Sequence, residues 1–85
     1  MHTMTVTVGS AVGLHARPAA IISEAAGELG SDVTIGIPGG NAVDAGSSLM
    51  IMTLGAKKGA TVEVSGEDQA AVEKIAALVV QDLDA

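Results

Sequence analysis

Short runs in which apolar and polar residues alternate predict the strands of a sheet. Residues 4–8 (MTVTV) show the period-2 pattern of a strand with one covered face. The same alternation recurs over residues 33–37 and 61–65. A short fourth strand is expected over residues 41–44, and the glycines of the connection PGGN, residues 38–41, suit a hairpin with the strand before it.

Helical spacing of apolar residues predicts two helices in the first two thirds of the chain. The first runs from about residue 16 to residue 27, with small and apolar side chains on one face and Gly27 suited to its end. The second is short. Ser47 is expected to cap it, it continues to about Thr53, and Gly55 ends it.

The last helix has the clearest pattern of the three. Ser65 and Asp68 fit a capping box, in which two residues three apart satisfy free N–H groups of the first turn. The apolar side chains recur at the spacing of one helix face: Val72, Ile75, Ala76, Val79 and Leu83. The pattern therefore places Leu83 on the same face as the others.

Together these elements predict the order β-α-β-β-α-β-α and an α+β fold. Strands that alternate, instead of being apolar throughout, favour an antiparallel sheet with one solvated face. Three helices then cover the other face of four strands, which gives an α+β sandwich of two layers. A length of 85 residues suits one hydrophobic core, so we expect a single domain over residues 1–85.

Composition and charge exclude several classes of function. Ten carboxylates against four cations give a net charge of −6, and there is no aromatic side chain, so we expect no binding of nucleic acid. No stretch reaches the roughly 18–20 continuous apolar residues of a membrane span, so we expect no membrane insertion. With no cysteine in the chain, we expect a cytoplasmic protein. His2 is expected at a loose terminus, and no spacing of ligands indicates a metal ion or another cofactor.

The segment GLHARP, residues 13–18, places one of the two histidines and the only arginine at a helix start. Proline is tolerated in the first helical turn, where its missing N–H has no intrahelical partner, so His15 falls near the N-cap. The free N–H groups of Ala16 and Arg17, with the positive end of the helix dipole, favour an anion at this point. Gly13 permits a close approach of the backbone.

These residue types suit phosphoryl transfer. A neutral imidazole keeps one nitrogen free to attack a phosphoryl donor, and the Arg17 guanidinium offers planar donors to the phosphoryl oxygens. Because imidazole is a good leaving group, the phosphoryl group passes on readily, so carrier chemistry fits better than hydrolysis. Two other interpretations stay open from the residues alone: His15 is a cap or turn residue, or the domain is a non-catalytic interaction module that binds an anion at this helix start.

The segments GLHARPAA, residues 13–20, and SLMIMTLGAKKGA, residues 48–60, closely resemble the HPr family of histidine-containing phosphocarrier proteins of the bacterial phosphoenolpyruvate:sugar phosphotransferase system. The resemblance implies that His15 accepts a phosphoryl group on Nδ1 from enzyme I, which phosphoenolpyruvate charges. It implies that the group then passes to the IIA domain of a sugar permease, with Arg17 steadying it. The fold that the resemblance implies is an open-faced β-sandwich, with four antiparallel strands covered by three helices. A carrier of this kind has no turnover of its own and is not an enzyme. A nitrogen-related branch, in which the carrier feeds regulatory IIA proteins, has the same chemistry and stays an alternative.

The resemblance also implies that enzyme I and the IIA domains dock on the first two helices. The apolar run after Ser47 is too rich for one face of a two-turn helix, so part of it is expected to be exposed. The residues expected to contribute to docking are Ala20, Leu49, Met50, Ile51 and Met52. We expect the chain itself to be a monomer. Lys57 and Lys58, in the turn that follows, are interpreted as a solvated charge pair without a role in the site.

Ser47 is a candidate for regulatory phosphorylation, again on the basis of the resemblance. It aligns with the serine that a dedicated kinase modifies in many members of the family. Here Gly46 replaces the lysine common before that serine, and Ser48 stands beside it. A phosphate on Ser47 adds about −2 charge within the apolar run and is expected to weaken docking.

Overall fold

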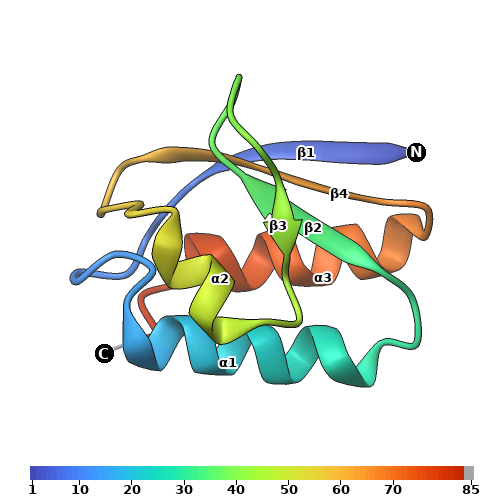
Figure 1. The fold of residues 1–85 in the computed structure, drawn as a ribbon, viewed down its shortest axis with the longest axis horizontal. Helices are drawn as coiled ribbons and strands as arrows, with labels where there is room; N and C mark the ends of the chain where they lie inside the picture. The colour runs from blue at the N-terminus through green and yellow to red at the C-terminus, as the bar shows by residue number, and fades with distance from the viewer. Residues whose placement is uncertain (84–85) are drawn as a thin grey trace.

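The computed structural model describes residues 1–83 and shows a four-stranded sheet with three helices (Figure 1). Along the chain the elements are β1 (His2–Thr7), α1 (Ala16–Glu28), β2 (Val33–Gly36), β3 (Val43–Asp44), α2 (Ser48–Thr53), β4 (Thr61–Gly66) and α3 (Gln69–Val80). This order confirms the predicted β-α-β-β-α-β-α arrangement and the α+β class. Residues 84–85, which the predicted domain includes, lie outside the described residues.

The strand β4 lies inside the sheet, whose order is β1-β4-β2-β3 with antiparallel neighbours throughout. Val64 of β4 pairs with Met4 on one side and with Ile35 on the other. These three side chains therefore share one face of the sheet. Val64 and Ile35 are fully buried, whereas Met4, on the edge strand, is 38% exposed.

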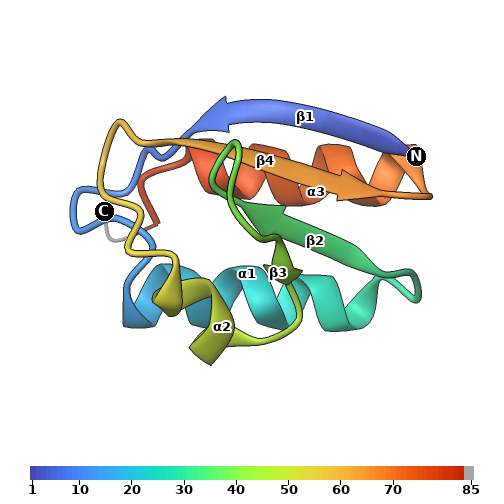
Figure 2. The ribbon, with the colours of Figure 1, turned by 45° about the horizontal axis from the view of Figure 1, so that its top comes forward.

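All three helices lie on one face of the sheet, and none of the described helices covers the other face (Figure 2). The helices α1 and α3 run side by side, α3 packs on β1 and β4, and the short α2 packs on α1. The largest fully buried side chains of the core are aliphatic: Ile22, Ile35, Ile51, Ile75, Val62, Val64, Val72 and Val79. Burying each of them stabilises the fold by about 1.5–3 kcal/mol, which makes aliphatic packing the main source of stability in a chain without aromatic residues.

The structure corrects the predicted ends of two helices. The helix α1 continues past Gly27 to Glu28, and the glycine in the left-handed conformation typical of a helix end is Gly30, with φ of +71°. Gly27 is tolerated inside the last turn because a glycine there costs only about 1 kcal/mol, which helix packing outweighs. The helix α3 ends at Val80, and Leu83 packs against the core from the segment that follows.

The capping box predicted at the start of α3 is wrong. Asp68 alone caps this helix, because its carboxylate accepts a hydrogen bond from the Ala70 N–H at 3.0 Å. Ser65 belongs instead to β4, where its hydroxyl oxygen lies 3.0 Å from that of Thr3 on β1. Since β4 continues to Gly66, Ser65 is a strand residue, and its side chain does not cap the helix.

The predicted hairpin between β2 and β3 is confirmed, but β3 is shorter than the expected residues 41–44. It spans Val43–Asp44 and pairs with Thr34 and Ile35. The turn begins where the Gly40 N–H donates to the Ile37 carbonyl at 2.8 Å. The connection takes up the residues before Val43, and it projects from the sheet in Figure 1.

Candidate functional site

His15 is the N-cap residue of α1, as predicted. Its backbone is extended (φ −92°, ψ −164°), its side chain makes no capping hydrogen bond, and the residue is exposed. The residues around it are anchored, because Leu14 is only 3% exposed and Pro18, in the first turn, is buried. The backbone at His15 is therefore held in place while the imidazole stays accessible, and the ring does not act as a cap.

Two backbone N–H groups at the start of α1 have no hydrogen-bond acceptor among the described residues. The Ala19 N–H donates to the carbonyl of His15 at 2.9 Å, and Pro18 has no N–H. Ala16 and Arg17 come before the first intrahelical bond, and their N–H groups donate to no other residue of the described chain. With the positive end of the dipole of this 13-residue helix, they favour an anion just outside α1.

The loop before α1 is locked against the loop before β4. The Leu14 N–H donates to the Ala56 carbonyl at 2.8 Å. Gly13 has φ of +76°, and a Cβ at this position would collide with backbone atoms of Ala56 and Lys57. The close approach expected of Gly13 is therefore made to this neighbouring loop, and only glycine permits it.

A surface hollow of about 200 Å³ lies between these two loops. Its lining residues are Val12, Leu14, His15, Met52, Gly55, Ala56 and Lys57. Since one water molecule takes about 30 Å³ of liquid volume, the hollow has room for a group of several heavy atoms. His15 and Lys57 are the ionisable side chains of the lining, and the others are apolar residues or glycine.

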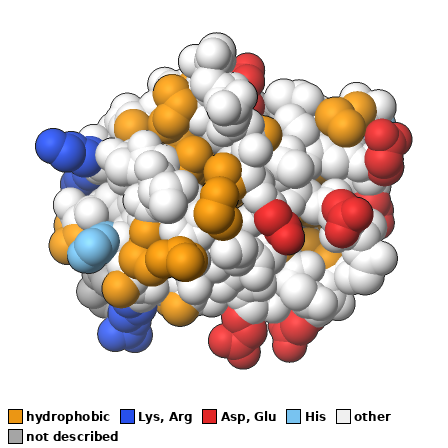
Figure 3. Space-filling view, in the orientation of Figure 1, with side chains coloured by type: hydrophobic (Ala, Val, Ile, Leu, Met, Phe, Trp, Pro, Cys, Tyr) orange, Lys and Arg blue, Asp and Glu red, His pale blue; other side chains and the backbone are white. Residues whose placement is uncertain are grey.

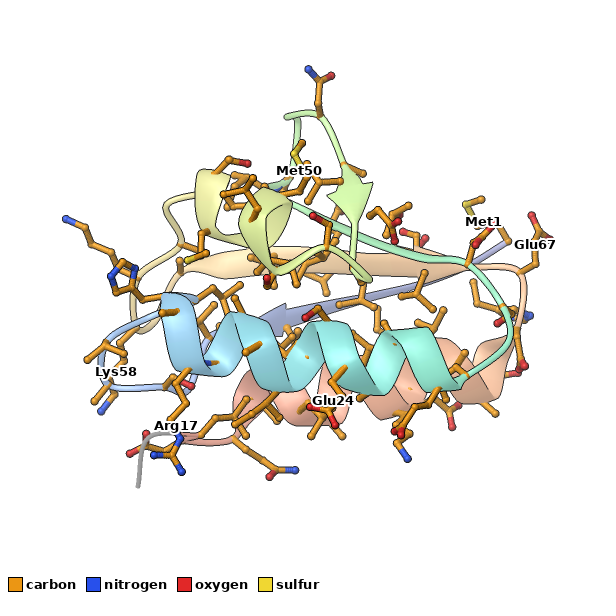
Figure 4. All side chains as sticks on the ribbon, turned by 60° about the horizontal axis from the view of Figure 1, so that its bottom comes forward. Met1, Arg17, Glu24, Met50, Lys58 and Glu67 are labelled. Atoms are coloured by element: carbon orange, nitrogen blue, oxygen red, sulfur yellow. The ribbon has the colours of Figure 1, made fainter. Side chains whose placement is uncertain are left out.

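Arg17 lies at the same end of the molecule but is not part of this lining. It is exposed and forms no ion pair with any residue of the described range. Residues two apart on a helix point to different sides, so the guanidinium has to turn back over the helix start to contact a group on His15. Figure 4 shows Arg17 and Lys58 at the end where α1 begins, and Met1 and Glu67 at the opposite end.

The residues predicted to dock partners divide into exposed and buried ones. Leu49 is 68% and Met50 42% exposed, Ala20 is exposed, and Met52 is half-buried. Ile51 is fully buried, so its inclusion among docking residues is wrong: it lies on the face of α2 that packs inward. The remaining residues, Ala20, Leu49, Met50 and Met52, are called the α1–α2 surface below. Apolar side chains gather over this part of the molecule in Figure 3.

Ser47 is the N-cap residue of α2, as predicted. Its hydroxyl oxygen accepts a hydrogen bond from the Met50 N–H at 3.2 Å. It is half-buried and directly precedes Ser48, the first residue of the helix. Any group added to Ser47 therefore lies beside the exposed side chains of Leu49 and Met50.

Charge is unevenly distributed over the molecule. On the face shown in Figure 3 the visible Lys and Arg side chains lie at the left end, and most of the visible Asp and Glu side chains lie toward the right and along the lower edge. The left end is where α1 begins. The site therefore has a cationic surrounding in a chain whose net charge is −6.

Other parts of the molecule offer less for chemistry. His2 lies in β1 opposite Gly66, so the expected loose terminus is wrong: strand pairing holds it. Among residues 1–83, no three His, Cys, Asp or Glu side chains converge as a metal site would require. Over the same residues, no helix has the length and apolar character to cross a membrane. A second hollow, of about 310 Å³, lies near the end of α1, and its lining includes Asp32 and Asp44.

Comparison with known proteins gives a consistent result over most of the chain. A family model described as "PTS HPr component phosphorylation site" matches residues 2–81. The phosphocarrier protein HPr of Streptomyces coelicolor is 42% identical over 82 residues, which cover 93% of this chain and 88% of the relative.

Solved structures of similar proteins have the same fold. HPr-C-His from Thermoanaerobacter tengcongensis superposes with a TM-score of 0.88 at 28% identity, covering 100% of this chain and 98% of the other. The phosphocarrier protein HPr from Bacillus anthracis gives a TM-score of 0.78 at 34% identity, covering 92% and 95% of the two chains. The open-faced sheet with three helices is thus the fold that these proteins share.

Proposed function

The chain belongs to the HPr family of phosphocarrier proteins of the phosphotransferase system, and on this premise we propose that His15 accepts a phosphoryl group from enzyme I and passes it to the IIA domain of a sugar permease. The observation that carries the proposal is the state of the His15 side chain. The imidazole is exposed, makes no capping bond, and stands at a helix start with two free N–H groups.

The first transfer is an in-line displacement at phosphorus. The lone pair of Nδ1 of His15 forms the new nitrogen–phosphorus bond while the bond to the donor atom of enzyme I breaks, and its electron pair returns to that donor atom. The N–H groups of Ala16 and Arg17 donate to the phosphoryl oxygens, and the helix dipole favours their negative charge. The second transfer reverses these roles, with the imidazole as the leaving group.

The same geometry supports a carrier role for the chain over hydrolysis of the phosphoryl group. Hydrolysis needs a base that activates a water molecule near the phosphorus. The hollow beside His15 is lined by apolar residues, glycine and one lysine, and no carboxylate belongs to its lining. We therefore assign the protein the role of a reactant in two consecutive transfers, not that of an enzyme.

The α1–α2 surface is proposed as the docking site for both partners. It lies next to His15, because α1 and α2 pack on each other and Met52 lines the same hollow as the imidazole. Flexible methionine side chains adapt to partners of different shape. Contact over this surface brings a partner's reacting group to the imidazole.

Phosphorylation of Ser47 is proposed as a means of weakening this docking. The phosphate satisfies the start of α2 in place of the hydroxyl, so the helix persists, but it places about −2 charge beside Leu49 and Met50. Incubation with a serine kinase and ATP should give an acid-stable label that Ser47→Ala loses and Ser48→Ala keeps. A label retained by Ser47→Ala contradicts this assignment.

Phosphoryl transfer in a reconstituted chain tests the main proposal. The protein is incubated with enzyme I and labelled phosphoenolpyruvate, and a IIA domain is then added. The label should appear on the protein, survive alkali, be lost in mild acid, and move to the IIA domain. His15→Ala should abolish the label on the protein and on the IIA domain, with unchanged circular dichroism. His2→Ala, which removes the other histidine, should behave as the wild type.

The remaining outcomes separate the alternatives. Transfer to a regulatory IIA protein but to no sugar-specific IIA domain assigns the chain to the nitrogen-related branch. No label in the wild type, with an anion still bound at the start of α1, leaves a non-catalytic interaction domain. A label that resists acid contradicts phosphorylation of a histidine.

A further inference from the structure

We propose that Lys57 contacts the phosphoryl group on His15 and is a further cation, in addition to Arg17, that stabilises the phosphorylated state. The inference rests on the proposed function and extends it to a residue for which the sequence suggested no role. Lys57 is exposed and belongs to the loop before β4, far from His15 along the chain. The two residues nevertheless line one hollow.

The backbone beneath Lys57 is fixed relative to His15. The hydrogen bond from the Leu14 N–H to the Ala56 carbonyl, at 2.8 Å, joins the residues that directly precede His15 and Lys57. The contact of Gly13 with the backbone of Lys57 holds the loops together at the same level. The root of the lysine side chain is therefore positioned by two backbone contacts, while its four-carbon stem leaves the ammonium free to move.

Lys57 lines the hollow beside His15, which distinguishes it from the other cations at this end of the molecule. Arg17 and Lys58 lie at this end of the molecule but do not line the hollow. Lys57 forms no ion pair with a residue in the described range, so no carboxylate there competes for its ammonium. Val12, Leu14 and Met52 give the hollow apolar walls that offer no other charge to the phosphoryl group.

The phosphoryl group supplies the anion that this lysine lacks. It adds about −2 charge next to the imidazole. The N–H groups of Ala16 and Arg17 contact it from the helix side, and the Lys57 ammonium contacts it from the hollow. The lysine therefore favours the phosphorylated form over the free form, and it also compensates for the acidic net charge of −6, which opposes an added anion.

Two measurements on phosphorylated protein test the role of Lys57. The first is the equilibrium constant for phosphoryl exchange with enzyme I. Lys57→Met should lower that equilibrium constant about 3- to 10-fold, and Lys57→Arg should keep it near the wild-type value. A salt concentration of about 1 M should reduce the difference between Lys57→Met and the wild type. The second is the pH titration of the ³¹P chemical shift, in which Lys57→Met should move the second ionisation of the phosphoryl group to higher pH.

Lys58→Met is the matched control, because it removes the same charge from the next residue of the same loop. It should change both measurements much less than Lys57→Met. Equal effects of the two substitutions, or none, overturn the inference while leaving phosphorylation of His15 intact. If the wild type takes no phosphoryl group on His15, the proposed function itself fails, so the two failures are distinguishable.

Discussion

At the scale of residues, the position of His15 is set by its neighbours and not by contacts of its own ring. Pro18 fixes the register of the helix start, Leu14 anchors the chain in the core, and the imidazole is left without a hydrogen bond to the helix. The N-cap position of His15 could be predicted from the sequence because proline has a strong positional preference. The place of Lys57 could not, because it depends on a contact between two distant loops that leaves no periodic pattern.

Substitution at Gly13 tests the contact between these loops. Gly13→Ala should lower the free energy of unfolding by about 2–4 kcal/mol, since the residue has positive φ and a Cβ would meet backbone atoms. Gly39→Ala is the control, because Gly39 also has positive φ but open space around it. It should cost only about 1 kcal/mol. Equal losses in urea denaturation, followed by circular dichroism, would falsify the claim that the loops are packed at Gly13.

At the scale of elements, the three helices differ in whether a side chain caps the free N–H groups of their first turn. The start of α1 has no side-chain cap and keeps donors for an anion, whereas α2 and α3 are capped by Ser47 and Asp68. The periodic faces of the helices could be predicted, since burial follows the helical repeat. The partner of Ser65 could not, because a serine before a helix suits a cap and a strand equally well until the end of β4 is known.

The corrected cap of α3 makes a quantitative prediction. Asp68→Ala should lower the free energy of unfolding by about 1 kcal/mol, because the Ala70 N–H loses its acceptor. Ser65→Ala should cost less, since it removes only an exposed contact with Thr3 on the sheet. Denaturant titration of both variants checks which loss of stability is larger. A larger loss for Ser65→Ala would contradict the assignment of Asp68 as the sole cap.

The α1–α2 surface makes a prediction about docking. Met50→Asp should slow phosphoryl transfer from enzyme I about 10-fold, because a charge interrupts the apolar contact with the partner. Met4→Asp is the comparison, since Met4 is similarly exposed, at 38% against 42%, but lies on β1. Its transfer rate should match that of the wild type. Circular dichroism of both variants checks that the fold is intact. Equal slowing by both variants argues against docking at α2.

At the scale of the whole molecule, an aliphatic core under one sheet face carries a site at one end. The fold class and order of elements could be predicted because alternation along the strands and periodicity along the helices both report burial. The gathering of Arg17, Lys57 and Lys58 at the site end could not, because it depends on which loops meet in space. This arrangement gives the chain a cationic end despite its net charge of −6.

A single substitution in the core can remove a large part of the free energy of unfolding. A domain of 85 residues has a free energy of unfolding of about 4–13 kcal/mol. Ile75 is fully buried in α3, so Ile75→Ala should cost about 2–5 kcal/mol and Ile75→Val about 1 kcal/mol. Urea titration by circular dichroism measures both, since the chain has no aromatic residue for fluorescence. A loss below 1 kcal/mol for Ile75→Ala contradicts the tightly packed core.

The central claim is that the exposed ring of His15 takes the phosphoryl group, and its most direct test is to locate that group. The protein is charged by enzyme I and phosphoenolpyruvate, kept alkaline, digested and sequenced by mass spectrometry. The account predicts one phosphoryl group on the peptide containing His15, absent after brief exposure to mild acid. A phosphoryl group found on any other residue, with the His15 peptide unmodified, contradicts it.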